Sequence, residues 1–145
     1  MNGMTPIVKK VTQLIVGLTF LYGIYIITHG HLTPGGGFAG GAVVAGSFVL
    51  LVLAYGSNIL KLKKREEGSS VVESLGILLF TVLAFAAIFI GTKVFFANYL
   101  PKGVIGELIS AGVIPLYNIA VGIEVAAALF TIFLALVIYK EEVLK

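Results

Sequence analysis

The chain has 145 residues, of which 59% are hydrophobic and only 12% charged. Soluble domains carry about a quarter charged residues, so this composition excludes an ordinary water-soluble globule and indicates a membrane protein. The formal net charge of +3 does not predict a nucleic-acid partner, because the basic residues lie between apolar stretches, as they do beside membrane spans. Without cysteine and with only two histidines, the sequence predicts no disulfide, no cysteine-based redox chemistry and no metal site.

Four apolar stretches are long enough to cross a bilayer as helices, which takes about 20 residues each. The expected spans run roughly from Val11 to Thr28, from Gly37 to Leu60, from Val71 to Ala97 and from Val113 to Tyr139. Little of the chain remains for a soluble domain. We therefore expect an all-α integral membrane fold, with four transmembrane helices in one domain over residues 1–145.

The positions of lysine and arginine predict the orientation of these spans. Eight of the ten lie at the two ends of the chain or in the segment 61–70, which we expect to be a loop. Only Lys93 and Lys102 lie on the other side. Because basic residues are enriched in cytoplasmic loops, both termini and the 61–70 segment are expected in the cytoplasm.

Two histidines, His29 and His31, follow the first span. Histidine changes its charge close to physiological pH, so His31 is a candidate for a proton or ion path at the membrane surface. The plainer interpretation is a turn residue or an interfacial hydrogen-bonding group. Two histidines with no carboxylate nearby do not predict a metal site.

The most specific segment, residues 30–41, opens the second span. Its turn and helix-packing candidates are Pro34, Gly35, Gly36, Gly37, Gly40 and Gly41. Proline fixes φ close to a helix start, and glycine permits turn conformations that other residues avoid. Glycines spaced four apart, such as Gly37 and Gly41 or Gly36 and Gly40, let another backbone approach closely. The pattern leaves open whether that backbone belongs to this chain or to another subunit.

The same glycines also satisfy the spacing G-x-G-x-x-G, through Gly35, Gly37 and Gly40. In a nucleotide-binding fold this motif follows a strand, opens a helix and is followed about 20 residues later by an acidic residue. Neither the strand nor the acidic residue is expected here, and a membrane helix follows instead. The sequence therefore predicts no nucleotide partner.

Two carboxylates lie in or near the spans. Glu73 is three positions into the expected third span, where we interpret it as an interfacial charge, with an ion path as the alternative. Glu124 lies 11 residues after Val113. At a rise of 1.5 Å per residue that distance is about 16 Å, close to the middle of a hydrocarbon core about 30 Å thick.

Tyr117 and Thr131 lie seven residues to either side of Glu124, so the three residues share one stripe of the helix. A charged side chain at the centre of a bilayer costs on the order of 3 kcal/mol, so this stripe is expected to face protein or water. Glu124 is accordingly either an ion-path carboxylate or a polar contact to a neighbouring helix. The sequence leaves both interpretations open.

The segment 30–41, which reads Gly-His-x-Thr-Pro-Gly-Gly-Gly-Phe-x-Gly-Gly, resembles the MnhB/MrpB subunits of the Mrp/Mnh multisubunit cation/proton antiporters. The resemblance runs from about Lys10 to Tyr139. The same subunit type recurs in membrane-bound hydrogenases and sulfur reductases of archaea. The resemblance implies a multi-pass subunit of the cell membrane, with no catalytic residue and no cofactor of its own. It also implies partners among the other membrane subunits of a hetero-oligomeric complex.

One departure from the family pattern concerns the start of the last span. Many MnhB-type subunits of stand-alone antiporters resemble aromatic-Asp-x-Gly-Val there, whereas this chain reads Tyr-Asn-Ile-Ala-Val over 117–121. Asn118 replaces the usual carboxylate and is a further ion-path candidate. The departure favours a subunit of a sodium/proton antiporter module within a respiratory complex, contributing to ion translocation and assembly. The alternatives are a purely structural scaffold and the MnhB-type subunit of a stand-alone antiporter.

Overall fold

A computed structural model describes residues 3–56, 62–107 and 110–143 of the chain. Its helices there are α1 (Pro6–Thr28), α2 (Gly36–Tyr55), α4 (Leu62–Phe89) and α5 (Ile114–Val143). All four are long and apolar enough to cross a membrane. The prediction of an all-α fold with four potential spans is therefore confirmed.

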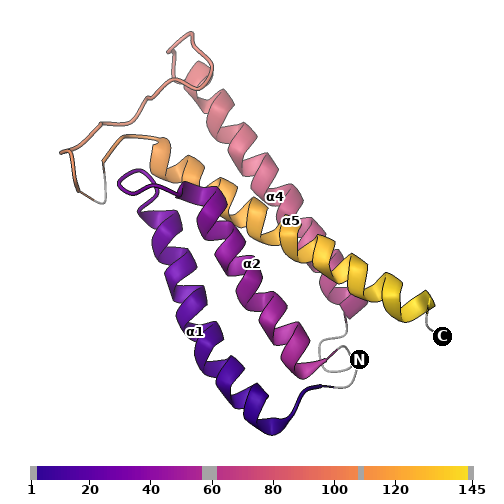
Figure 1. Ribbon diagram of the computed structural model, residues 1–145. Coiled ribbons are helices and arrows are strands. Elements are labelled where there is room, and N and C mark those ends of the chain that lie inside the picture. Colours follow the sequence, from indigo (N-terminus) through magenta and orange to yellow (C-terminus); the bar gives the residue numbers. More distant parts are fainter. Residues whose placement is uncertain (1–2, 57–61, 108–109, 144–145) are drawn as a thin grey trace.

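Helix α5 occupies the centre of the arrangement (Figure 1). The antiparallel hairpin of α1 and α2 packs against one side of α5, mainly through α2, and α4 packs against another side. Within the described residues, α4 contacts no helix except α5. The spatial order α1–α2–α5–α4 thus differs from the order along the chain.

The first two helices begin earlier than expected, α2 by one residue, at Gly36. Helix α1 starts at Pro6, before Val11, and proline suits the first turn because that turn does not need its missing N–H. Helix α2 ends at Tyr55, where Gly56 takes a positive φ of 80°. The end that the sequence predicts for this span, Leu60, lies outside the described residues.

The expected boundaries of the third span are wrong at both ends. Helix α4 begins at Leu62, so the described part of the segment 61–70 is helical and not a loop. Lysine, arginine and glutamate are good helix formers, which allows the helix to extend past its apolar stretch. At the other end α4 stops at Phe89 and not at Ala97, because Gly91 turns the chain with a φ of 93°.

The start of α5 is held by Asn98, from the long connection that follows α4. The side-chain oxygen of Asn98 accepts a hydrogen bond of 3.1 Å from the backbone N–H of Val113, and its side-chain nitrogen donates to the carbonyl oxygen of Ala111 at 3.1 Å. The helix itself begins at Ile114, one residue after the expected position. It continues past Tyr139 to Val143, again into charged residues that favour helix.

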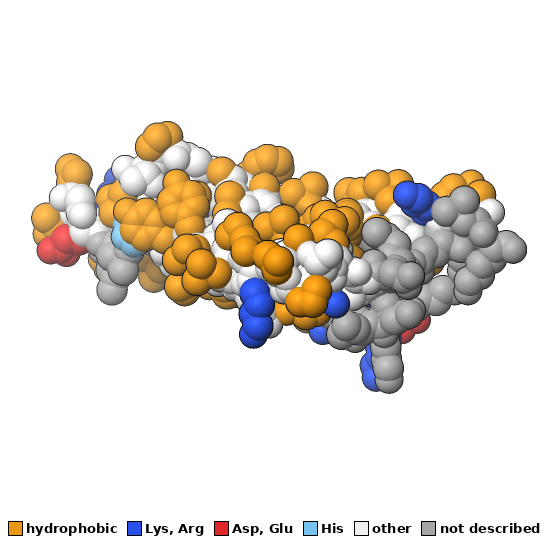
Figure 2. All heavy atoms as spheres, turned by 60° about the horizontal axis from the view of Figure 1, so that its bottom comes forward, with side chains coloured by type: hydrophobic (Ala, Val, Ile, Leu, Met, Phe, Trp, Pro, Cys, Tyr) orange, Lys and Arg blue, Asp and Glu red, His pale blue; other side chains and the backbone are white. Residues whose placement is uncertain are grey.

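Most of the surface is apolar. Among the described side chains on the face seen in Figure 2, most are hydrophobic and few are charged. Large residues such as Leu18, Phe38 and Phe89 are exposed, whereas the buried cluster around Leu134 and Val52 is small. Because water would penalise so much apolar surface, these helices suit a lipid environment or contact with other membrane proteins.

The predicted orientation can be tested with single cysteines, because the natural chain has none. Lys140, near the end of α5, and Lys102, in the connection between α4 and α5, are both exposed. We expect Lys140→Cys to react with a membrane-impermeant maleimide only from the cytoplasmic side of sealed vesicles. Lys102→Cys should react only from the opposite side. Labelling of both variants from the same side would contradict the orientation.

Candidate functional site

The contact between α2 and α5 is made by glycines. A Cβ atom added to Gly41 would lie 2.7 Å from the carbonyl oxygen of Gly122, and one added to Gly37 would overlap the backbone of Asn118. Real Cβ atoms essentially never approach so closely. The two helices therefore meet backbone to backbone at positions where only glycine fits.

An adjacent part of the same side of α2 makes a similar contact with α1. A Cβ atom on Gly40 would lie 2.8 Å from the carbonyl oxygen of Gly23, and Ile27 of α1 would collide with Cβ atoms on Gly40 and on Gly122. The contacts of Gly37, Gly40 and Gly41 are thus made within this chain.

The turn before α2 uses glycine for a different reason. Gly35 has φ 133° and Gly36 has φ 63°, which are conformations that side chains rarely adopt. Pro34 precedes them in the exposed part of the turn. Gly36 is therefore needed for its backbone conformation, which the sequence pattern alone did not separate from a packing role beside Gly40.

Asn118 lies where this turn meets α5. Its side-chain oxygen accepts a hydrogen bond from the backbone N–H of Gly37 at 3.4 Å. Its side-chain nitrogen is buried and has no hydrogen-bond partner among the described residues. A Cβ atom on Gly30 would lie 2.9 Å from that nitrogen. The Asn118 amide is therefore packed against glycine backbone, and its side-chain N–H groups have no acceptor among the described residues.

Glu124 lies on another side of α5, against α4. A Cβ atom on Gly76 would lie 2.8 Å from the Cβ of Glu124, so the backbones of α4 and α5 are in close contact at this level. The Glu124 side chain is half-buried. On the same side of α5, the rings of Tyr117 and Phe80 are 5.2 Å apart in an edge-to-face arrangement. Glu124 and Tyr117 therefore both lie at the contact with α4.

The hydroxyl groups near this contact differ in their partners. The Tyr117 hydroxyl is buried without a hydrogen-bond partner among the described residues. Thr131 donates to the carbonyl oxygen of Ala127 in its own helix at 2.9 Å, and Ser69 of α4 donates to the same oxygen at 3.0 Å. The Ser69 bond joins α4 to α5, whereas the Thr131 hydroxyl serves its own helix.

Glu73 lies on the face of α4 that contacts α5. Ser69 and Gly76, which both contact α5, are four residues before it and three residues after it, so the three residues share a face. The side chain of Glu73 is half-buried. Because α4 begins at Leu62, Glu73 is 11 residues from the helix start, where the sequence had suggested three. The turns before Val71 are rich in charged and polar residues and precede the apolar stretch, so the interpretation of Glu73 as an interfacial charge stays a prediction.

His31 lies apart from these carboxylates, in the turn between α1 and α2. Its Nε2 atom is 3.4 Å from the carbonyl oxygen of Glu107, in the connection between α4 and α5, and its Nδ1 atom is buried without a partner among the described residues. His29 stacks on Tyr25 with ring centres 4.1 Å apart. The described residues contain no group of three or more His, Cys, Asp or Glu that could hold a metal ion.

Three residues important for this arrangement were not singled out from the sequence, namely Gly76, Gly122 and Ser69. Gly76 and Gly122 are isolated glycines within long apolar stretches, and such a glycine often marks a close helix contact in a membrane. That signal was available in the sequence, but it does not identify the partner helix. Ser69 carried no signal, because it lay in a segment expected to be a loop.

With this geometry described, comparison with known proteins identifies the class. The family described as a domain related to the MnhB subunit of Na+/H+ antiporters matches residues 7–131. The chain belongs to this MnhB family. The resemblance seen in the glycine-rich segment is thereby confirmed.

Individual relatives agree with this assignment. An uncharacterized protein of Methanocaldococcus jannaschii is 40% identical over 137 residues, which cover 88% of this chain and 50% of that protein. A Staphylococcus aureus protein described as "Putative antiporter subunit mnhB2" is 27% identical over 132 residues, covering 90% of this chain and 92% of the relative.

Among solved structures, one chain in the structure of the membrane-bound sulfane sulfur reductase, an archaeal respiratory membrane complex, has a TM-score of 0.72 and 31% identity. The match covers 89% of this chain and 56% of that one. This chain thus spans about half the length of the archaeal proteins that it matches. Its similarity extends both to antiporter subunits and to a respiratory complex.

The glycine contact between α2 and α5 generates a stability prediction. Gly41→Ala should lower the stability of the folded chain by about 1–3 kcal/mol, because the new methyl group collides with the Gly122 carbonyl oxygen. The measurement is the thermal unfolding midpoint of the full chain in detergent.

Gly46→Ala is the matched control, since Gly46 is exposed on the same helix and a Cβ atom there meets nothing within 4 Å. It should leave the midpoint unchanged or raise it slightly, because alanine favours helix over glycine. Equal midpoints for the two variants would refute the close-contact explanation.

Proposed function

We propose that this chain is a non-catalytic membrane subunit of an Mrp-type sodium/proton antiporter module within an energy-converting respiratory complex. The family assignment supports an antiporter-type subunit, and the likeness to a chain of the sulfur reductase complex supports the respiratory setting. The replacement of the usual family carboxylate by Asn118 also favours that setting over a stand-alone antiporter. In this proposal the chain resides in the cell membrane with both termini in the cytoplasm.

The position of Glu124 is the observation that supports a role of this chain in ion movement. It lies 10 residues into α5, about 15 Å along the helix axis, and therefore near the middle of the span. A carboxylate at that depth is costly unless it has a polar partner or access to water. Its close contact with α4 supports a protein-facing position. We assign Glu124 to the ion path on this basis.

Glu73 and Tyr117 complete the proposed path. Glu73 lies on the contacting face of α4, about one turn from the level of Gly76 and Glu124, and Tyr117 lies about two turns of α5 further towards the connection with α4. Two carboxylates and a phenol hydroxyl that has no partner among the described residues lie along one interface, and such groups can pass a proton or bind a cation in steps. We propose that the remaining protein groups of this path come from other subunits.

Asn118 and His31 have a separate role in the proposal. Both lie near the turn between α1 and α2, and each has a buried nitrogen without a partner among the described residues. Buried polar groups are usually satisfied by protein or by ordered water. We assign these two residues to a hydrated entrance on the side of the membrane opposite the termini.

The decisive variant is Glu124→Gln in the assembled complex. Glutamine keeps the size of the side chain but removes the ionisable group, so sodium- or proton-coupled transport in sealed vesicles should fall at least about tenfold. Assembly should be preserved, because the backbone contact with Gly76 is unchanged. Subunit content is measured on the same preparations.

Glu107→Gln provides the matched control, since Glu107 is exposed in the connection between α4 and α5. Its transport should equal that of the wild type. If Glu124→Gln assembles normally and transports at the wild-type rate, the chain acts as a structural scaffold. Loss of assembly in Glu124→Gln would likewise assign this residue to docking and not to transport.

A further inference from the structure

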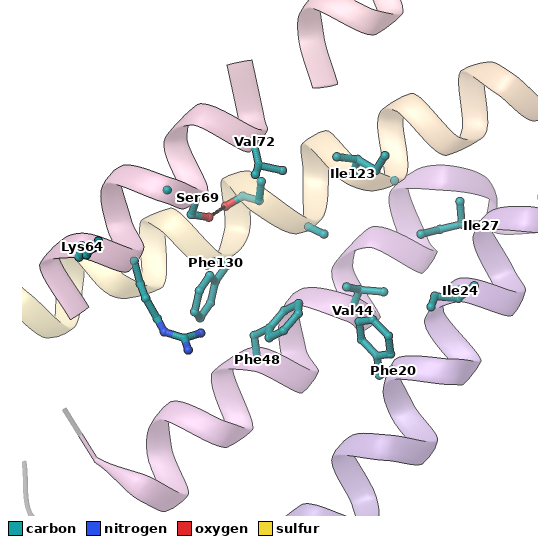
Figure 3. A pocket seen from close by; sticks show the side chains of 15 residues that line it. Phe20, Ile24, Ile27, Val44, Phe48, Lys64, Ser69, Val72, Ile123 and Phe130 are labelled. Atoms are coloured by element: carbon teal, nitrogen blue, oxygen red, sulfur yellow. Dashed lines mark hydrogen bonds between the residues drawn. The ribbon is translucent and has the colours of Figure 1, made fainter. Parts of the chain in front are cut away.

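An apolar groove separates α4 from the hairpin of α1 and α2. Its volume is about 570 Å³, which is within the range of about 300–1,000 Å³ typical of ligand sites. All four helices contribute to its lining, and α5 lies between the two sides (Figure 3). The groove exists because α4 contacts α5 but neither α1 nor α2 among the described residues.

Three aromatic rings from three helices run along one side of this groove. Phe20 of α1 and Phe48 of α2 have ring centres 5.8 Å apart, and Phe48 and Phe130 of α5 have ring centres 5.5 Å apart. Aliphatic residues such as Ile24 and Val72 complete the surface. In Figure 3 these side chains project towards the space between the hairpin and α4. The surface suits a hydrocarbon chain.

The polar contribution comes almost entirely from the first turns of α4. Lys64 and Arg65 line the groove, and both side chains are at least partly exposed. No acidic side chain lines it among the described residues. Glu66 and Glu67, which follow in the sequence, are not among the lining residues. The groove combines a long apolar surface with a margin of two basic side chains at the start of α4.

We propose that this groove binds an anionic phospholipid, with an acyl chain against the three phenylalanines and the phosphate against Lys64 and Arg65. Basic side chains at a membrane surface attract anionic lipids, and arginine can bind a phosphate through two parallel hydrogen bonds. The proposal concerns a ligand of this chain alone and does not depend on a role in ion transport.

The lining of the groove favours a lipid over a helix from a partner subunit. A helix with its side chains is about 10 Å across. An acyl chain is thinner and flexible, and it can follow the curved surface between Phe20 and Val72. The positive margin also suits a phosphate better than an apolar helix surface.

The test uses the full chain in nanodiscs that contain equal amounts of phosphatidylglycerol, which is anionic, and phosphatidylcholine, which is zwitterionic. The chain is released from the nanodiscs in the mass spectrometer, and the lipids that stay bound to it are counted by native mass spectrometry. The wild-type chain should retain phosphatidylglycerol in preference to phosphatidylcholine. Replacing both basic residues, as Lys64→Gln with Arg65→Gln, should lower this preference about tenfold.

A second variant blocks the apolar part. Gly68 lines the groove and a Cβ atom there meets nothing within 4 Å, so Gly68→Leu fills space in the groove without a collision at its first carbon. The Gly68→Leu variant should retain less phosphatidylglycerol and less phosphatidylcholine than the wild type. Because leucine favours helix over glycine, α4 itself should not be weakened.

Matched controls exist for both variants. Lys10→Gln with Lys140→Gln removes two exposed basic side chains that do not line the groove, and Gly17→Leu fills open space on α1 outside it. Both controls should behave as the wild type. Equal retention of the two lipids by the wild type, or wild-type retention in Gly68→Leu, would overturn the proposal. So would an equal loss of lipid preference in the lysine control.

Discussion

The close approach of backbones on two sides of α5 is the constraint on which this structure depends. In lipid the hydrophobic effect does not drive helices together, so their association relies on close packing and on polar contacts. Gly41 against Gly122 joins α5 to α2, and Gly76 against Glu124 joins it to α4. A larger side chain at any of the three glycines would push these backbones apart.

The same contacts position the polar groups of the last helix. Asn118 meets the backbone of Gly37 on the side of α2, and Glu124 meets Gly76 on the side of α4. In both cases a polar side chain lies next to a residue that has none. Glycine lets the backbones approach closely at both places, and the backbone N–H of Gly37 donates a hydrogen bond to the Asn118 side chain. The same residues therefore serve helix packing and the placement of polar side chains.

The number and type of helices could be predicted because each has a long apolar stretch. The ends of α4 could not, since its first turns are charged yet helical, while the apolar residues near Phe95 follow a turn at Gly91 that composition does not reveal. Helical spacing correctly placed Tyr117 and Glu124 on one side of α5. It could not identify Gly76 as the neighbour of Glu124, because periodicity contains no information about which helices are adjacent.

The single interface that holds α4 has a mechanical consequence. With no described contact to α1 or α2, α4 is placed relative to the other described helices through α5. The width of the groove therefore depends on the angle between α4 and α5, which the contact of Gly76 with Glu124 helps to fix. A larger residue at position 76 is expected to change the groove and the surroundings of the carboxylate together.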